Sequence, residues 1–228
     1  MRAAALISGG KDSLYALLLA LRRGFTVTTL VFVQPQRSNS YMFHYPNTHL
    51  LPLLAKAIGI PFISIPVSGE KEREIDELVE KLRAQKIAVN VLIAGAIASH
   101  YQYKRILRIC SELNLEPFLP LWGREPASVL VEEVRAGLVA IITSVAAWGL
   151  DRSWLGRTLN EDSVRELLKI CRKHGINPAG EGGEYETFVL DSPLHKARIR
   201  IKSARTLWHC GAGVLLIDEA ELVPKPKK

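Results

Sequence analysis

The chain has 228 residues, of which 48% are hydrophobic and 23% are charged. This length allows one substantial core, or a main domain with a smaller one beside it. No apolar run approaches the roughly 20 residues that cross a bilayer. The first residues read as a strand rather than a signal peptide, so we expect a cytoplasmic protein. Three isolated cysteines, without a C-x-x-C pair, argue against a cysteine metal site or a disulfide framework.

The net charge of +7 raises the question of nucleic-acid binding, because lysine and arginine displace counterions from phosphates. Part of this charge lies in the last four residues, K-P-K-K, and much of the rest is spread along expected helices. The chain has no dense basic block with interleaved aromatic residues of the kind that follows a single strand of nucleic acid. We therefore do not expect a nucleic-acid partner, and an acidic protein partner fits the charge equally well.

In the first half of the chain, strand patterns alternate with helix patterns. Apolar runs rich in β-branched residues read as buried strands, and amphipathic runs between them read as helices. Strands are expected at residues 3–7, 26–33, 61–65, 89–94 and 117–122, and helices at residues 14–21, 48–59, 70–85 and 101–113. Pro52 places the start of the second helix late, or kinks it. This order predicts an α/β fold, a doubly wound parallel sheet with right-handed crossovers.

A glycine turn with the sequence S-G-G-K-D-S joins the first strand to the first helix. Paired glycines permit positive φ and turn backbone N–H groups inward, and the helix N-terminus adds unsatisfied donors and the positive end of its dipole. The lysine adds a positive charge, and the serines add hydroxyl donors. An anion such as a phosphate is therefore expected to bind the turn, which consists of Ser8, Gly9, Gly10, Lys11, Asp12 and Ser13.

Asp12 is the exception in this turn, because a carboxylate beside a phosphate is repulsive unless it holds Mg²⁺ or orients the lysine. Both interpretations stay open. The spacing of the turn matches neither the P-loop pattern G-x-x-x-x-G-K-[ST] nor the dinucleotide pattern G-x-G-x-x-G.

Two further loops leave the same end of the expected sheet. Residues 34–47 follow the second strand without periodicity, and a loop of this length is more often functional than idle. Residues 95–99 follow the fourth strand. Ligands of doubly wound sheets bind at the carboxyl ends of the strands, near the point where the strand order reverses. One nucleotide is therefore expected to contact the glycine turn and both loops.

The pattern changes beyond Trp122. Helices are expected at residues 125–136 and 161–174, and strands at residues 139–145, 197–207 and 213–217. This order reads as a second, smaller α+β domain. The expected division is 1–122 for a nucleotide-binding domain, 123–222 for a substrate-binding domain and 223–228 for a basic tail, with a cleft between the two domains.

The second domain contains an acidic, glycine-rich stretch at residues 180–187, G-E-G-G-E-Y-E-T. Three carboxylates this close raise one another's proton affinity. The stretch is either a solvated acidic loop or a site for an ammonium, an imidazolium or Mg²⁺. Asp191 and His195 follow closely, and each could belong to this site or simply cap or pack.

The glycine turn resembles the SGGxDS signature of the PP-loop ATP pyrophosphatases, which grip the pyrophosphate of ATP with it. The chain also contains S-Y-M-F-H, G-E-K-E-R-E, G-A-I-A-S-H-Y-Q, P-L-W-G-R, G-L-D-R-S-W-L-G-R and G-E-G-G-E-Y-E-T-F-V-L-D-S-P-L. Together these motifs resemble the diphthine–ammonia ligase family, and in particular a short, archaeal-type member. The resemblance runs from about residue 3 to residue 195, nearly the whole chain.

This resemblance implies an adenine-nucleotide α-hydrolase-like, Rossmann-like domain that binds ATP with Mg²⁺, and a smaller domain that faces a protein substrate. The implied reaction is the last step of diphthamide synthesis on translation elongation factor 2. The diphthine carboxylate attacks the α-phosphorus of ATP, and pyrophosphate leaves. Ammonia then converts the acyl-adenylate into the amide and releases AMP.

The resemblance also implies roles for individual residues. Lys11 and Asp12 are expected to be catalytic, with Asp12 as the metal candidate. The set expected to bind ATP is Ser8, Gly9, Gly10, Lys11, Asp12, Ser13, Met42, His44, Gly95 and Ser99.

The acidic motif is expected to face the protein substrate or ammonium. Glu184 and Glu186 are the expected catalytic acids of this motif, because a nearby carboxylate can take the proton of ammonium. The full set expected to bind the substrate is Tyr101, Gln102, Glu181, Gly182, Gly183, Glu184, Glu186 and Thr187.

Two other functions compete with this reading. A PP-loop ligase or thiolase that modifies tRNA would suit the basic charge, although a thiolase normally needs paired cysteines to carry sulfur. A sensor that holds ATP without turnover is the second alternative, although it would have little use for the acidic motif. The sequence leaves open whether the chain forms a homodimer.

Overall fold

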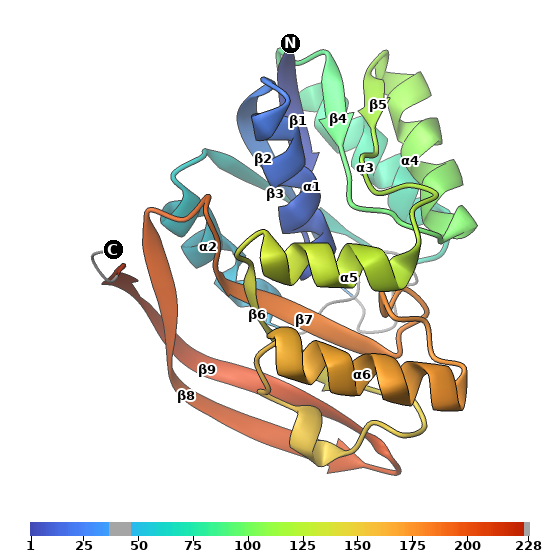
Figure 1. Ribbon diagram of the computed structural model, residues 1–228. Helices are drawn as coiled ribbons and strands as arrows, with labels where there is room; N and C mark the ends of the chain where they lie inside the picture. Colours follow the sequence, from blue (N-terminus) through green and yellow to red (C-terminus); the bar gives the residue numbers. More distant parts are fainter. Residues whose placement is uncertain (37–46, 226–228) are drawn as a thin grey trace.

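The computed structural model describes residues 1–36 and 47–225, which form two sheets with helices packed against them (Figure 1). Met42 and His44 lie outside the described residues, so their expected contact with a nucleoside stays a prediction. Within the described ranges, no helix has the length and apolar character needed to span a membrane.

The first sheet is parallel, with the strand order β3-β2-β1-β4-β5. Its strands are β1 (Arg2–Leu6), β2 (Thr26–Pro35), β3 (Phe62–Val67), β4 (Val91–Ile93) and β5 (Glu116–Phe118). The predicted doubly wound parallel sheet is confirmed. The order reverses between β1 and β4, so the loops that leave these two strands flank the place where such sheets bind ligands.

Four helices cover the two faces of this sheet. They are α1 (Lys11–Arg22), α2 (Leu51–Ile58, after the 3₁₀ turn η1, Thr48–Leu50), α3 (Arg73–Ala84) and α4 (His100–Leu113). Along β1, Ala3 and Ala5 join the core formed with α1 and α2, whereas Ala4 joins the core formed with α3 and α4. This alternation is what a strand buried on both faces requires. Pro52 lies in the first turn of α2, so the predicted late start of that helix is confirmed.

The strand expected at residues 117–122 is shorter than predicted. It ends at Phe118, and a turn that includes Pro120 follows. Leu121 is nevertheless buried, so the apolar run reflects core packing from a turn rather than a longer strand.

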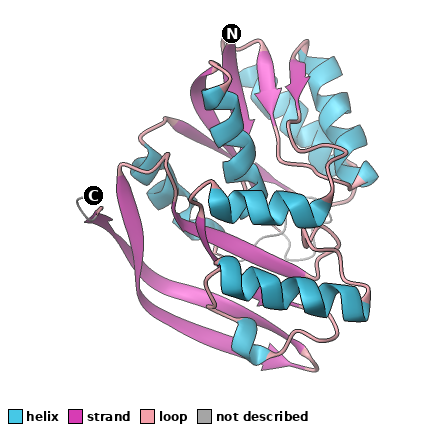
Figure 2. Cartoon of the chain, viewed as in Figure 1, coloured by secondary structure: helices cyan, strands magenta, loops and turns pink. Residues whose placement is uncertain are grey.

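The second sheet is antiparallel, with the strand order β7-β6-β9-β8. Its strands are β6 (Val139–Val145), β7 (Tyr185–Asp191), β8 (Ala197–His209) and β9 (Ala212–Pro224). Two helices, α5 (Pro126–Arg135) and α6 (Glu161–His174), pack against each other beside this sheet, and the short η2 (Arg152–Trp154) lies below them (Figure 2). The last strand includes the first two residues of the expected tail, and Lys225 after it pairs with Asp191 at 2.7 Å.

The sequence did not predict β7, because the acidic, glycine-rich stretch that leads into it is typical of a loop. The strand pairs with β6 and places Glu186 opposite Ser144. It also reaches the first sheet, since the backbone N–H of Val189 donates to the carbonyl of Gly9 at 2.9 Å. Strand β7 therefore connects the second sheet directly to the glycine turn.

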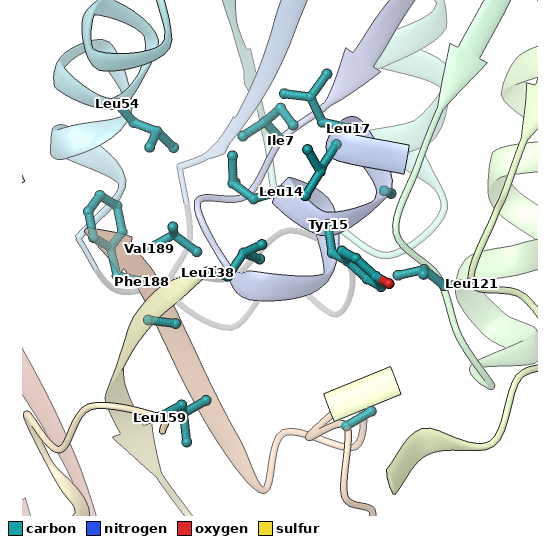
Figure 3. Close-up of a cluster of buried hydrophobic side chains, with 14 of the residues drawn as sticks. Ile7, Leu14, Tyr15, Leu17, Leu54, Leu121, Leu138, Leu159, Phe188 and Val189 are labelled. Atoms are coloured by element: carbon teal, nitrogen blue, oxygen red, sulfur yellow. The ribbon is translucent and has the colours of Figure 1, made fainter. Parts of the chain in front are cut away.

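A continuous apolar core extends across both sheets. Figure 3 shows Leu14 and Leu54 of the first half close to Phe188 and Val189 of β7, and all four side chains are buried. Gly9 lies where these layers meet, with φ of +89°, and a Cβ there would lie 3.0 Å from the Phe188 ring. Only glycine accommodates both the conformation and the contact. The glycine turn is thus fixed against the second half of the chain.

Residues 191–195 turn out to pack rather than to join a site. His195 is 4% exposed, and its Nδ1 lies 2.7 Å from the Ser192 hydroxyl. Its Nε2 has no hydrogen-bond partner within the described part of the chain. Burial lowers the pKa of His195 from 6.5 to about 4, so the imidazole is neutral in the folded protein near pH 7.

We expect this histidine to make the protein sensitive to acid. Its stabilising effect is complete above pH 6.5 and is lost as the pH falls toward 4, because the unfolded chain then binds a proton that the folded chain excludes. The free energy of unfolding should fall by about 3 kcal/mol at most from this group. Urea unfolding of the wild type and of His195→Gln between pH 7 and pH 4.5 measures the effect. An equally steep loss in both proteins would show that other groups cause it.

Candidate active site

A pocket opens at the carboxyl ends of β1 and β4, and both predicted motifs contribute to it. The predicted site residues that line it are Ser8, Gly10, Lys11, Asp12, Ser13, Gly95, Gln102, Glu181, Glu186 and Thr187. The segment before β7 and the start of β7 form one wall, and the glycine turn forms the facing wall. The described residues that were predicted for the site but do not line this pocket are Gly9, Ser99, Tyr101, Gly182, Gly183 and Glu184.

Two serines hold the glycine turn in shape. The Ser13 hydroxyl donates to the carbonyl of Gly10 at 3.0 Å and accepts the backbone N–H of Ser8 at 3.3 Å. The Ser8 hydroxyl accepts the N–H of Gly10 at 3.2 Å. Helix α1 begins directly after Gly10, so its first N–H groups lie beside the pocket without partners inside the helix.

Gly10 presents only backbone atoms to the pocket. A Cβ built there would lie 3.4 Å from the Ser8 hydroxyl and 3.4 Å from the Thr187 hydroxyl, so even a methyl group would narrow the gap between the two walls. Backbone donors, a helix N-terminus and two hydroxyl groups are the donor set that suits a phosphate. The residues of the turn therefore fit the phosphates of a nucleotide.

Thr187 links the two walls of the pocket through a hydrogen bond. Its hydroxyl accepts the backbone N–H of Lys11 at 3.1 Å, and the side chain is buried. This bond uses a donor in the first turn of α1, whose remaining N–H groups stay available to a ligand. Thr187 was predicted to bind substrate, and the structure shows that it also anchors the glycine turn.

The side chain of Lys11 is not free to extend into the pocket. It is 1% exposed, and its ammonium donates to Asp12 Oδ1 at 2.6 Å and to the carbonyl of Ala179 at 3.0 Å. A second carboxyl oxygen, Glu133 Oε2 on α5, lies 3.5 Å from the ammonium without forming a hydrogen bond to it. Burial alone would lower the pKa of Lys11, but the carboxyl groups of Asp12 and Glu133 outweigh this effect and hold the pKa well above its usual value.

Glu133 is a residue that sequence reasoning missed. It is 1% exposed, and burial raises the pKa of its carboxyl group well above the ordinary value, against the opposing effect of Lys11. The sequence did contain a signal. Val129, Leu130 and Glu133 fall at three- and four-residue spacing on one face of α5, and all three are buried. A carboxylate within the apolar stripe of a helix indicates a specific buried partner.

The three glutamates of the acidic motif have three different environments. The carboxylate of Glu181 accepts the backbone N–H groups of Ile97 and Ala98, both at 2.7 Å, and that of Ser99 at 3.1 Å. It therefore caps the loop that enters α4, and Ser99 itself caps the helix by accepting the N–H of Gln102 at 3.3 Å. This interaction holds the second half of the chain against the loop after β4.

Glu184 shapes its own loop. Its carboxylate accepts the backbone N–H of Gly182 at 2.8 Å and that of Asn177 at 3.3 Å. The predicted catalytic role of Glu184 stays a prediction.

Glu186 is the member of the motif whose carboxyl group titrates near neutral pH. It lines the pocket from β7, and burial, with a further contribution from the charge of Asp12, raises its pKa to about 8. Lys11 opposes this shift. A carboxyl group with a pKa near the working pH is suited to general acid–base chemistry.

Gln102 and Tyr101 lie at the start of α4, but only Gln102 lines the pocket. The ring of Tyr101 lies against the guanidinium group of Arg105, which is 3.2 Å from the ring centroid. The expected contact of Tyr101 with a substrate stays a prediction.

Asp12 is the only predicted metal residue, and its side chain is 26% exposed at the pocket. Among the described residues, no group of three or more histidine, cysteine, aspartate or glutamate side chains could hold a metal ion. Mg²⁺ usually binds through one or two carboxylates together with substrate phosphates, and a single aspartate beside a phosphate cradle fits that pattern. The alternative, that Asp12 orients the lysine, is also compatible with its 2.6 Å contact with Lys11.

Gly95 brings the loop after β4 onto the backbone of the glycine turn. A Cβ at this position would lie 2.7 Å from the carbonyl oxygen of Asp12 and 2.8 Å from the nitrogen of Ser13. No side chain fits so close to a backbone, so the two loops touch only because residue 95 is glycine.

We expect Gly95→Ala to push these loops apart. Stability should fall by about 1–3 kcal/mol, and nucleotide affinity should fall about tenfold because the pocket wall moves. Thermal unfolding and nucleotide titration measure the two effects. Gly24→Ala is the control, since a Cβ at Gly24 meets nothing within 4 Å but must adopt positive φ. It should cost stability without changing affinity, and equal affinity losses in both variants would refute the prediction.

A parallel sheet with an S-G-G-K-D-S turn where its strand order reverses, closed by a second sheet that supplies Thr187 and Glu186, defines a PP-loop protein. The model of the diphthamide synthase N-terminal domain matches residues 1–117, and that of the diphthamide synthase C-terminal domain matches residues 126–223. The chain belongs to the diphthamide synthase family, so the predicted resemblance is confirmed.

Proteins similar to this chain are named diphthine–ammonia ligase. The diphthine–ammonia ligase of Mus musculus is 36% identical over 230 residues, which cover 92% of this chain and 86% of the relative. The human protein is 35% identical with the same coverage. The protein of Schizosaccharomyces pombe is 32% identical over 94% of this chain but only 38% of its own length. These relatives are ligases that form a carbon–nitrogen bond, and the chain is an enzyme of that class.

Proposed function

We propose that the chain amidates diphthine on translation elongation factor 2, using ATP and ammonia and releasing AMP and pyrophosphate. The observation that carries this proposal is the pocket itself. The phosphate cradle of the glycine turn and the carboxyl group of Glu186 line one space, although they lie about 175 residues apart in the sequence. The family and the names of the relatives support the choice of substrate. We place the reaction in the cytoplasm, with elongation factor 2.

The glycine turn would hold the phosphates of ATP. The N–H groups at the start of α1 would donate to the charge that builds on pyrophosphate as it leaves, and preorganised donors of this kind lower the barrier. The hydroxyls of Ser8 and Ser13 would keep these donors in place, because they already bond within the turn. The ammonium of Lys11 would act from the interior, where Asp12, Ala179 and Glu133 surround it. Asp12 would hold Mg²⁺ together with phosphate oxygens, and a bound Mg²⁺ would neutralise part of their charge.

Adenylation solves the chemical problem of the reaction. A carboxylate is a poor acyl donor. Its oxygen bonds to the α-phosphorus as the bond to pyrophosphate breaks, which converts it into a mixed anhydride with AMP as the leaving group. Ammonia must be neutral to attack the acyl carbon. Glu186, with a pKa of about 8, would take a proton from ammonium or from the amine as the new bond forms.

The experiment that tests this function measures pyrophosphate release and amide formation. The purified protein receives ATP, Mg²⁺ and ammonium, with elongation factor 2 that carries diphthine, with the factor before that modification, or with tRNA. We expect pyrophosphate and amide in equal amounts with the diphthine-bearing factor alone. Release of pyrophosphate with tRNA, or ATP binding without any release, would favour a tRNA-modifying enzyme or an ATP sensor and would overturn the proposal.

A further inference from the structure

A buried carboxyl group lies behind the glycine turn. Glu133 projects from α5 in the second half of the chain, and its Oε2 lies 3.5 Å from Lys11 Nζ. Neither of its oxygens has a hydrogen-bond partner among the residues that the structure describes. A carboxyl group buried without such bonds costs stability, so a side chain of this kind needs a reason beyond packing.

The ammonium of Lys11 connects three separate segments of the chain. It donates to Asp12 at the start of α1 and to Ala179 in the loop before β7, and it lies 3.5 Å from the carboxyl group of Glu133 in α5. Its fourth neighbour is the ring of Tyr185, whose centroid lies 5.8 Å away. Because Glu186 and Thr187 follow Tyr185 directly, the same cation that pairs with Asp12 also fixes the strand that carries the far wall of the pocket.

The two carboxyl groups approach Lys11 from different sides. The side chain of Asp12 is 26% exposed at the pocket, whereas that of Glu133 is 1% exposed in the interior. If Asp12 were its only partner, the ammonium of Lys11 would move with the Asp12 carboxylate whenever a ligand in the pocket displaces that carboxylate. A second carboxyl group on the interior side, with an oxygen 3.5 Å from the ammonium, opposes this movement, because a polar oxygen attracts a cation strongly where water is excluded.

We propose that Glu133 is a positioning residue for the reaction, one that holds the ammonium of Lys11 in the interior and thereby fixes Asp12 and the start of β7 around the pocket. This inference rests on the proposed function for its kinetic consequence. Its structural consequence, that Glu133 acts through Lys11, does not depend on any substrate.

A double-mutant cycle tests the inference, with the variants Glu133→Leu, Lys11→Met and the two combined. For Glu133→Leu we expect kcat per folded protein to fall at least about tenfold, since small displacements at a reacting centre are costly. The affinity for ATP should stay within about threefold, because the backbone cradle remains. The double variant should be no slower than Lys11→Met. Glu133→Gln, which keeps an oxygen acceptor for the ammonium, should recover part of the activity.

Thermal unfolding gives a readout that needs no substrate. Lys11→Met leaves Glu133 buried without its cation and should lower the unfolding temperature, whereas the double variant removes both groups and should recover most of that loss. Hydrogen exchange of the backbone amides at residues 8–13 should rise in each single variant. The matched control is Glu74→Leu, which alters an equally buried glutamate on α3, a helix that does not line the pocket. It should leave kcat and the exchange at residues 8–13 unchanged.

The outcomes separate this inference from the proposed function. Wild-type turnover in Glu133→Leu, or losses that multiply in the double variant, would overturn the positioning role. If the wild type forms no amide, the proposed function fails, and the unfolding and exchange cycle then decides the inference alone. In that case, independent effects of the two single variants would overturn it, and non-additive effects would support it.

Discussion

Asp12→Asn is expected to lower the rate of ATP-dependent amidation by about 10³-fold while the protein stays folded. Asparagine keeps the size of the side chain and an oxygen that can accept from Lys11, but it loses the negative charge that Mg²⁺ requires. Because Glu133 remains beside Lys11, the buried ammonium keeps a carboxyl group as its neighbour and the fold should survive. The affinity for ATP should fall in the presence of Mg²⁺ and stay unchanged without it.

Single-turnover amidation and ATP titration, each with and without Mg²⁺, measure this prediction. Asp162→Asn is the control, since Asp162 is an exposed aspartate at the start of α6, a helix that does not line the pocket. It should behave as the wild type. If Asp12→Asn kept more than about a tenth of the wild-type rate, Asp12 would not be the metal residue. The interpretation that it only orients Lys11 would then hold.

A substitution of Lys11 would test the catalytic role of the glycine turn less clearly than Asp12→Asn. Its ammonium is buried between two carboxyl groups, and removing one partner of a buried ion pair typically costs about 3–5 kcal/mol. Lys11→Ala would therefore combine lost activity with lost stability. Asp12→Asn separates the two effects because its side chain lies at the edge of the pocket.

Glu186→Gln is expected to lower kcat by about 10²-fold with little change in ATP affinity. The variant removes a group that can take a proton but keeps the volume of the side chain, and it leaves the glycine turn intact. Glu184→Gln is the matched comparison. It changes a glutamate that accepts N–H groups of its own loop, so its main effect should be on stability rather than on kcat.

The pH dependence identifies the role of Glu186 more sharply than the rate alone. A general base works in its deprotonated form, so the wild-type rate should rise with pH through about 8 as Glu186 loses its proton. The fraction of neutral ammonia also rises with pH, in both proteins. The ratio of wild-type kcat to Glu186→Gln kcat removes that shared effect, and it should increase up to about pH 8 and then level off. A ratio that is constant with pH would contradict the role of a base.

The sequence was informative where local patterns decide the structure. The alternation of buried strands with amphipathic helices predicted the parallel sheet, and the glycine turn lies where the prediction put it, at the reversal between β1 and β4. The acidic motif was predicted to face the substrate, and Glu186 lines the same pocket as the turn. Helix α2 begins late, at Leu51, because the proline that follows suits the first turn of a helix.

The parts that sequence reasoning missed depend on contacts between distant segments. Strand β7 follows a stretch of glycines and acids, and it forms because it pairs with β6 and hydrogen-bonds to the glycine turn. Glu181 bonds to a loop about 85 residues earlier, and the pKa of Glu186 depends on burial and on Asp12, about 175 positions earlier; no local pattern reveals either. Glu133 stood in an apolar stripe, but its partner Lys11 is 122 positions earlier in the chain.

We expect the space between the glycine turn and Glu186 to bind ATP for adenylation. The decisive measurement is a crystal structure of the protein with Mg²⁺ and a non-hydrolysable ATP analogue. It should show phosphates on the backbone of residues 8–13, with the α-phosphorus on the side that faces Glu186. Nucleotide bound elsewhere, or bound here with the α-phosphorus turned away from β7, would contradict this expectation.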